Sequence, residues 1–70
     1  MRIGHRLRQL RQAQHLTQLV LARRAHLSYQ YVSLLEHDQR NPTTKTLEAL
    51  AAALTVTVPA LLEDTPLRAP

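Results

Sequence analysis

Apolar residues recur along the chain at the three- and four-residue spacing that places them on one face of an α-helix. The first stripe consists of Ile3, Leu7 and Leu10. A longer stripe consists of Leu47, Leu50, Ala51 and Leu54. The first stripe predicts a helix over residues 3–14 that ends near His15. The second predicts a helix that begins after Thr43 or Thr44, because either hydroxyl can cap it.

Two shorter helices are expected between these stripes. The first covers about residues 18–25 after Thr17, whose hydroxyl can accept an unsatisfied backbone N–H group. The second covers about residues 29–37, and Ser28 is its expected cap. The residues expected to face inward are Leu21, Ala22, Ala25, Leu27, Val32 and Leu35. Helices this short are marginal alone, so packing must hold them.

The segment 55–58, TVTV, alternates like a strand. We predict a last short helix here instead, because the run is short and has no visible partner strand. Thr57 can cap this helix, and Pro59 falls in its first turn, where a missing N–H group costs nothing. Leu61 and Leu62 are its expected apolar anchors.

These patterns predict an all-α fold, a compact five-helix bundle over residues 1–64, followed by a frayed tail over residues 65–70. Seventy residues suffice for one small domain. The chain has no cysteine, so it has no disulfide framework and no thiolate metal site. It has no apolar run long enough to span a bilayer and no secretion signal. The expected location is the cytoplasm, or the nucleoid within it.

The net charge is +4, and the basic residues are concentrated in the first two thirds of the chain. They are Arg2, Arg6, Arg8, Arg11, Arg23, Arg24, Arg40 and Lys45. A basic face favours a polyanionic partner such as nucleic acid, and the alternative is a solvated surface that keeps a small protein soluble. Most of these arginines are interpreted as solvated, with Arg6 or Arg8 near a nucleic-acid backbone.

The stretch 17–37 has the two features needed to read bases in the major groove of DNA. These are a helix with polar side chains in its N-terminal half and a second helix that fixes its angle. Gln30 can form a bidentate pair with adenine, and Tyr29 offers a hydroxyl and a ring that can cover a thymine methyl. Ser33 and Leu34 lie one turn further on. Leu34 is either a methyl reader or a protein contact.

This stretch resembles the helix-turn-helix of phage repressors and Cro, often called the XRE family. The matching residues are Leu16, Thr17, Gln18, Leu21, Ala22, Leu27, Ser28, Tyr31, Val32, Ser33, Leu35, Glu36, Asn41, Pro42, Thr46, Leu47, Leu50, Ala51, Ala53, Leu54, Val56, Leu61 and Leu62. The resemblance covers nearly the whole chain. It implies a lambda-repressor-like DNA-binding domain with a central helix-turn-helix, and a sequence-specific transcriptional regulator, most simply a repressor. Such a protein would bind double-stranded DNA as a homodimer on a palindromic operator.

The resemblance also implies roles for individual residues. Gln18 would anchor a DNA phosphate at a helix N-terminus, which supplies N–H groups and a favourable dipole. The other expected backbone contacts are Thr17, Tyr31, Arg40, Asn41, Thr44 and Lys45. The alternatives are a surface residue for Gln18 and core packing for Tyr31. Arg11 and Glu36 match a pair that forms a buried salt bridge in some members of the family.

The sequence departs from the family at helix ends, where glycine usually provides a positive φ. Here these places hold His15, His26, Asp38 and Thr55. Histidine and aspartate tolerate a positive φ better than most residues, so we predict one at the first three. Thr55 is β-branched and tolerates it poorly, so the helix before it is expected to end differently.

A second departure is the apolar pair Leu19 and Val20, at places where similar proteins often carry acidic residues. The pair either packs against another helix or forms an exposed patch that favours a protein partner. The second interpretation is therefore an antitoxin-like interaction module of the same fold.

A dimer contact is expected near the C-terminus, where the same residues also serve the protomer's own core. They are Val56, Val58, Leu61, Leu62 and Leu67.

Catalytic and metal chemistry have little support in the sequence. The four histidines, His5, His15, His26 and His37, show no i, i+3 or i, i+4 ligand spacing. There is no glycine-rich phosphate loop and no carboxylate cluster. We therefore expect no metal, no cofactor and no enzyme activity. A role as a restriction–modification controller or a lysogeny switch remains a variant of the DNA-binding interpretation.

Overall fold

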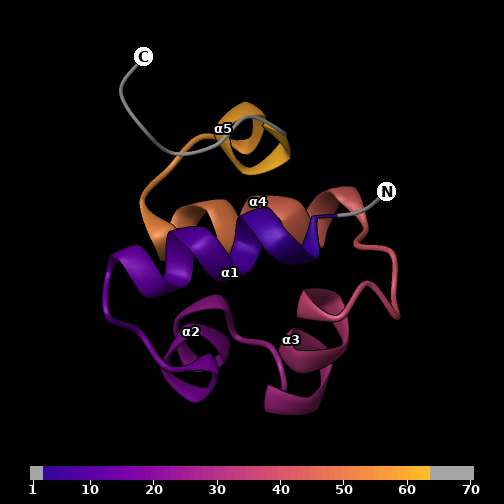
Figure 1. Cartoon of the computed structure of the whole chain (residues 1–70). Helices are drawn as coiled ribbons and strands as arrows, with labels where there is room; N and C mark the ends of the chain where they lie inside the picture. Colours follow the sequence, from indigo (N-terminus) through magenta and orange to yellow (C-terminus); the bar gives the residue numbers. More distant parts are fainter. Residues whose placement is uncertain (1–2, 64–70) are drawn as a thin grey trace.

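The computed structural model describes residues 3–63, and this range consists of five α-helices with no strand (Figure 1). The helices are α1 (Gly4–Ala13), α2 (Gln18–Ala25), α3 (Tyr29–Glu36), α4 (Thr44–Leu54) and α5 (Val58–Leu62). The expected all-α fold is therefore confirmed. The expected tail over residues 65–70, together with Leu67, lies outside the described residues.

The helices surround one core in three tiers (Figure 1). In this view α1 and α4 cross the middle, α2 and α3 lie below them, and α5 lies above. Helix α2 packs against α3 and α4, and α1 packs against α3 and α5. The pair α2–α3 is thus held from behind by the two longest helices, and its outer side remains at the surface.

Four of the helices are preceded by a capping residue with a hydroxyl side chain. Each accepts a hydrogen bond from the backbone N–H three residues further on, which removes one of the unsatisfied donors of a helix start. The capping residues are Thr17, Ser28, Thr43 and Thr57. The predicted caps are confirmed, and Thr43 rather than Thr44 is the cap of α4.

Helices α1 to α4 all end in the same left-handed turn without glycine. The residues with positive φ are His15 (57°), His26 (58°), Asp38 (55°) and Thr55 (57°). After each, the next residue donates its N–H to the carbonyl five residues back, which is the Schellman pattern. The predictions for the first three residues are confirmed, whereas the expectation that α4 ends differently at Thr55 is wrong.

The physical reason lies in the residue that follows each turn. After α1, α2 and α4 this residue is apolar and packs against the core. These residues are Leu16, Leu27 and Val56. Burial of Val56 and its 2.9 Å hydrogen bond to the carbonyl of Ala51 require the left-handed turn. The fold therefore imposes the conformation on the β-branched Thr55.

The core is aliphatic and continuous. Its fully buried side chains include Leu7, Leu21, Val32, Leu35, Leu50, Leu54 and Leu61. The two apolar stripes supply Leu7, Leu50 and Leu54. The other four were expected from the sequence as inward-facing residues of the shorter helices. The two apolar anchors expected in α5, Leu61 and Leu62, differ in burial, because neighbouring residues of a helix face different directions. Leu61 is fully buried, but Leu62 is 40% exposed, so Leu62 is not an anchor of the protomer's own core.

Candidate nucleic-acid interface

The N-terminal half of α3 presents polar side chains at the surface. Tyr29, with 49% of its surface exposed, and Gln30 lie next to each other there. One turn further on, Ser33 and Leu34 are half-buried. Opposite this face, Val32 and Leu35 are fully buried and fix the rotation of the helix. The structure therefore places the four expected base-contact residues together on the accessible side of α3.

The expected DNA-backbone contacts come from three separate segments. Thr17 and Gln18 stand at the start of α2, where Thr17 is exposed and Gln18 half-buried. In the connection from α3 to α4, Arg40 and Asn41 are exposed. Thr44 and Lys45, in the first turn of α4, are also exposed. Two of these segments are helix starts, where backbone N–H groups favour anions.

Tyr31 lies between α3 and α4. Its ring packs against the core, and its hydroxyl lies 3.4 Å from the hydroxyl of the buried Thr46. Thr46 also accepts from the Thr43 hydroxyl at 3.0 Å. Tyr31 therefore has the packing role that the sequence left open, and it ties α3 to the start of α4.

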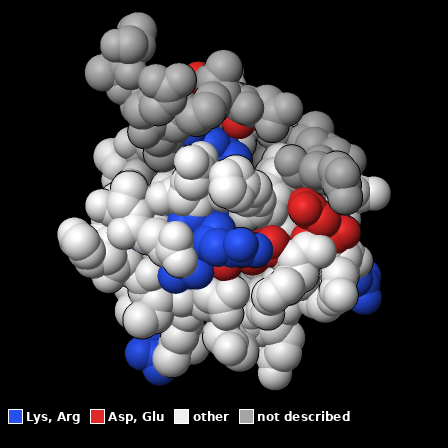
Figure 2. Space-filling model, in the orientation of Figure 1, with Lys and Arg blue, Asp and Glu red and all other residues white. Residues whose placement is uncertain are grey.

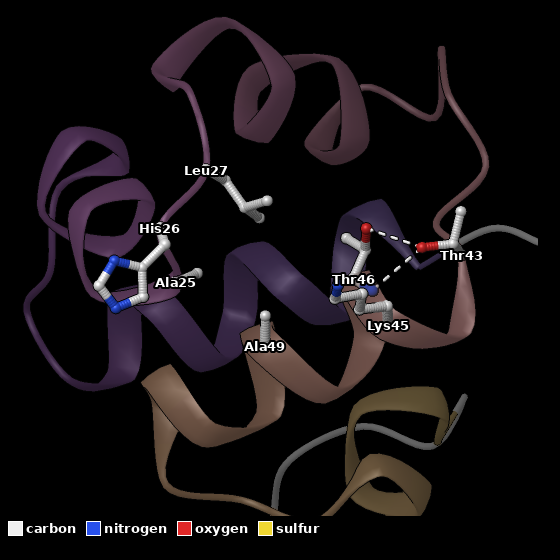
Figure 3. A pocket seen from close by; sticks show the side chains of 7 residues that line it. All are labelled: Ala25, His26, Leu27, Thr43, Lys45, Thr46 and Ala49. Atoms are coloured by element: carbon white, nitrogen blue, oxygen red, sulfur yellow. Dashed lines mark hydrogen bonds between the residues drawn. The ribbon is translucent and has the colours of Figure 1, made fainter.

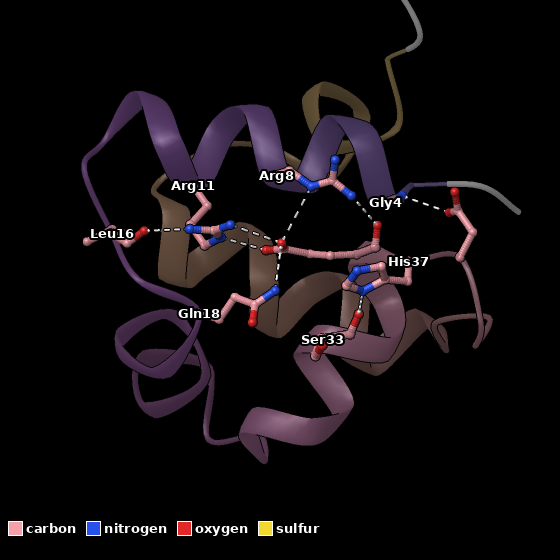
Figure 4. A network of polar contacts seen from close by, with 9 residues as sticks. Gly4, Arg8, Arg11, Leu16, Gln18, Ser33 and His37 are labelled. Atoms are coloured by element: carbon pink, nitrogen blue, oxygen red, sulfur yellow. Dashed lines mark hydrogen bonds and ion pairs between the residues drawn. The ribbon is translucent and has the colours of Figure 1, made fainter.

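A buried carboxylate connects the first three helices (Figure 4). Glu36, at the end of α3, is 1% exposed and accepts from Arg11 Nε at 2.6 Å and from Arg11 Nη2 at 3.0 Å. Gln18 Nε2 also donates to it, at 3.0 Å. Arg11 Nη1 donates to the carbonyl of Leu16 at 2.8 Å. The pair thus fixes the chain that leads into α2.

Two arginines of α1 donate hydrogen bonds to backbone carbonyls of other helices. Arg6 is only 8% exposed, and its Nε donates to the carbonyl of Ala60 at 3.0 Å. Arg8 Nη2 donates to the backbone carbonyl of Glu36 at 3.0 Å. The expectation of a solvated side chain is wrong for Arg6, whereas the Arg8 side chain is 41% exposed while it makes this contact. A usable signal was present, because Arg6 stands three residues after Ile3 and four before Leu10 on the apolar stripe.

Gly4 allows α1 to approach the end of α3 closely. Its N–H donates to Asp38 Oδ1 at 3.0 Å. A Cβ atom at this position would meet the backbone carbonyl of Glu36, with the carbonyl carbon at 2.8 Å, and Asp38 Oδ1 at 2.9 Å. No local pattern in the sequence predicts a glycine here, because its neighbours in space are more than thirty residues away along the chain.

The charge of the surface is mixed rather than uniformly basic. Basic and acidic side chains adjoin near the centre of the face shown in Figure 2. Part of the positive charge is paired internally, since Arg8 and Arg11 both form ion pairs with Glu36. Arg40, in the connection from α3 to α4, is exposed, and so is Lys45 in the first turn of α4. They are the cations available to a polyanion near α3 and α4.

A hollow of about 360 Å³ lies between the end of α2 and the first half of α4 (Figure 3). It is lined by Ala25, His26, Leu27, Thr43, Lys45, Thr46 and Ala49. None of the four base-contact candidates lines it.

Among residues 3–63, no three histidine or acidic side chains converge as a metal site would require. Within the same range, no helix is long and apolar enough to cross a membrane.

Two short helices joined by a tight turn, the second with an exposed polar face, define a helix-turn-helix DNA-binding domain. The sequence comparison agrees, because the helix-turn-helix family model matches residues 7–61. The chain therefore belongs to the helix-turn-helix family of transcriptional regulators, and the expected membership of the phage-repressor type is confirmed.

Proteins similar to this chain include an immunity repressor, a restriction-modification controller and a DNA-binding domain of known structure. The chain is 41% identical over 64 residues to the immunity repressor protein of Bacillus phage phi105. This match covers 91% of the chain but only 44% of the phage protein. The restriction-modification controller protein C.AhdI from Aeromonas hydrophila superposes with a TM-score of 0.85 and 38% identity, covering 87% of this chain and 92% of that one. The N-terminal DNA-binding domain of SinR from Bacillus subtilis gives a TM-score of 0.82 and 33% identity, covering 89% and 91%.

Proposed function

We propose that this chain is a sequence-specific transcriptional repressor that inserts α3 into the major groove of DNA. The single observation that carries the proposal is the adjacent exposure of Tyr29 and Gln30 on the N-terminal half of α3. In this half, Gln30 can pair with an adenine edge, and Tyr29 can contact a base edge or a thymine methyl. Leu34 and Ser33 extend the same side of the helix by one turn. The likeness to a phage immunity repressor supports a repressing role.

The remaining candidate residues fit contacts to the DNA backbone, which position a protein without reading sequence. Thr17 and Gln18 would meet a phosphate at the start of α2. The exposed Arg40 and Asn41 would meet the backbone beside α3, and Thr44 and Lys45 would do so at the start of α4. Such contacts make affinity fall steeply with salt.

The proposal includes a homodimer on a palindromic operator. One α3 reads few bases, and a symmetric pair spaces two such helices by about 34–36 Å, one turn of the duplex. The dimer contact is proposed at α5, where Leu62 is 40% exposed and the neighbouring Val56 and Val58 are half-buried. Leu61 is excluded from this contact, because the protomer's own core buries it fully.

The first experiment selects binding sites from random duplex DNA and then measures affinity with Gln30→Ala. Loss of discrimination at one base position, worth roughly 1–3 kcal/mol, is expected if Gln30 reads a base. Gln12→Ala is the matched control, because Gln12 is exposed on α1 and outside the proposed interface. Failure to enrich any motif would refute sequence-specific binding. If Gln30→Ala instead lowers affinity equally for every base at every position, Gln30 contacts the DNA backbone rather than a base.

The second experiment tests the dimer by analytical ultracentrifugation of Leu62→Lys. A lysine in an apolar contact is expected to shift the protein to monomer and to lower operator affinity, since both half-sites must then be filled separately. Gln12→Lys is the control, because it adds the same charge at an exposed position of α1 that lies outside the proposed contacts. A monomeric wild-type protein would refute the dimer.

A protein-binding role is the second candidate, and one observation favours it. Leu19 and Val20 are 45% and 37% exposed on α2, which leaves two neighbouring apolar side chains at the surface. An antitoxin-like module would bind a partner protein through these two side chains. A restriction–modification controller or a lysogeny switch would instead act through the DNA-contacting residues of α3. This candidate predicts that selection from random duplex DNA enriches no motif, so enrichment of a specific motif by the wild-type protein would count against it.

A further inference from the structure

Gln18 does not stand free at the start of α2. Its carboxamide nitrogen donates to Oε1 of the buried Glu36 at 3.0 Å, although the two residues are eighteen positions apart. Figure 4 shows the side chain of Gln18 pointing from α2 toward that carboxylate. The residue expected to meet DNA is therefore also part of the polar network that joins the helices.

This hydrogen bond determines the orientation of the Gln18 side-chain amide, with its nitrogen toward Glu36. The amide nitrogen carries two N–H groups, whereas the amide oxygen and an ionised carboxylate are acceptors only. Turning the amide over would place two acceptor oxygens against each other. With one N–H held by Glu36, the second N–H of the Gln18 amide is the donor left for an anion.

Glu36 is itself held in place. Arg11 donates to both of its carboxylate oxygens, at 2.6 and 3.0 Å, and such charge-assisted paired hydrogen bonds define an orientation strongly. The same guanidinium donates to the carbonyl of Leu16, the residue immediately before the Thr17 cap. The ion pair thus orients both the backbone at the start of α2 and the side chain that follows the cap.

We propose that Glu36, oriented by Arg11, is a positioning residue that holds the Gln18 amide ready to donate to a DNA phosphate. The inference rests on the proposed DNA-binding function. A preordered side chain loses less conformational freedom when it binds, so the contact strengthens binding more than a free glutamine would. Glu36 does not contact DNA itself in this arrangement, because it is buried.

The test is a double-mutant cycle on binding to a mixed-sequence DNA duplex, since phosphate contacts do not depend on sequence. Arg11→Met with Glu36→Met replaces the ion pair by apolar residues, an exchange that folded proteins often tolerate. Gln18→Ala is then measured in this background and in the wild type. The control background is Asp38→Asn, which alters the contact of α3 with Gly4 but leaves the Gln18 contact in place.

In the wild type, Gln18→Ala is expected to weaken binding by about 3- to 10-fold, the range of one modest hydrogen bond. The loss should stay the same in the Asp38→Asn background. It should fall below about 2-fold when the ion pair is absent, because an unpositioned glutamine contributes little. An equal loss in all three backgrounds, or no loss in the wild type, would overturn the proposal.

A second measurement uses the free wild-type protein and does not depend on the variants. The side-chain amide signals of Gln18 in a ¹H–¹⁵N spectrum should lie apart from those of the exposed Gln12. Signals that coincide with those of Gln12 would overturn the positioning. Absence of duplex binding by the wild type would refute the proposed function and the phosphate role together, whereas additive losses in a protein that binds DNA would refute only the positioning.

Discussion

Thr55 occupies a backbone conformation that suits glycine, so Thr55→Gly is expected to stabilise the protein. The residue ends α4 with φ 57° and ψ 44°. A left-handed conformation costs a residue with a Cβ roughly 1–2 kcal/mol. Glycine removes this cost but gives the unfolded chain more freedom, which offsets about 0.4–1 kcal/mol of the gain. Because Thr55 is exposed, little packing is lost. The middle of these two ranges gives a net gain of about 0.5–1 kcal/mol in the free energy of unfolding.

Thermal unfolding followed by circular dichroism measures this effect. For a domain of this size, 0.5–1 kcal/mol corresponds to a rise in Tm of about 2–8 °C. Ala52→Gly is the matched control, because Ala52 is exposed in the regular part of α4. Glycine there is expected to destabilise by about 1 kcal/mol. A Thr55→Gly protein with an unchanged or lower Tm, beside a lowered Ala52→Gly, would refute the reasoning from backbone strain.

Three further substitutions test the packing and the caps through urea unfolding. Gly4→Ala is expected to destabilise by about 1–3 kcal/mol, because its Cβ would meet Asp38 Oδ1 at 2.9 Å as well as a backbone carbonyl; an unchanged midpoint would contradict the close approach. Leu50→Ala empties a fully buried position and should cost about 2–5 kcal/mol, so a smaller loss would indicate a core that collapses around the gap. Thr17→Ala leaves the Val20 N–H without its cap and should cost about 1 kcal/mol, whereas Thr17→Ser, which keeps the hydroxyl, should cost little.

Local chemistry was enough to predict most of the fold. The bounds of α2 followed from the Thr17 cap and the apolar residues behind it, and the structure reproduces them as Gln18–Ala25. The short helix α5 followed from Thr57 and the position of Pro59 in its first turn. These features depend on residues a few positions apart, so a single sequence displays them directly. The same holds for the exposed side of α3.

The features that escaped prediction depend on distant parts of the chain. Thr55 adopts a glycine-like turn because Val56 must reach the core. Leu62 is exposed because α5 is a single turn that buries only Leu61. Arg6 is buried because α5 returns over α1 and offers it a carbonyl. In each case the partner is chosen by the tertiary fold, which propensity and spacing do not specify.

Glu36 shows how the fold and the proposed site depend on one group. Its carboxylate and backbone carbonyl receive donors from α1 and α2, so it fixes the end of α3 against both helices. Removing it would disturb the angle of α3 as well as the amide of Gln18, and would therefore lower stability and DNA affinity together. Removing the side chain of Gln30, which is exposed on α3, should change base preference and leave stability nearly unaltered. Stability and affinity measured on the same variants therefore separate residues that hold the reading helix from residues that read.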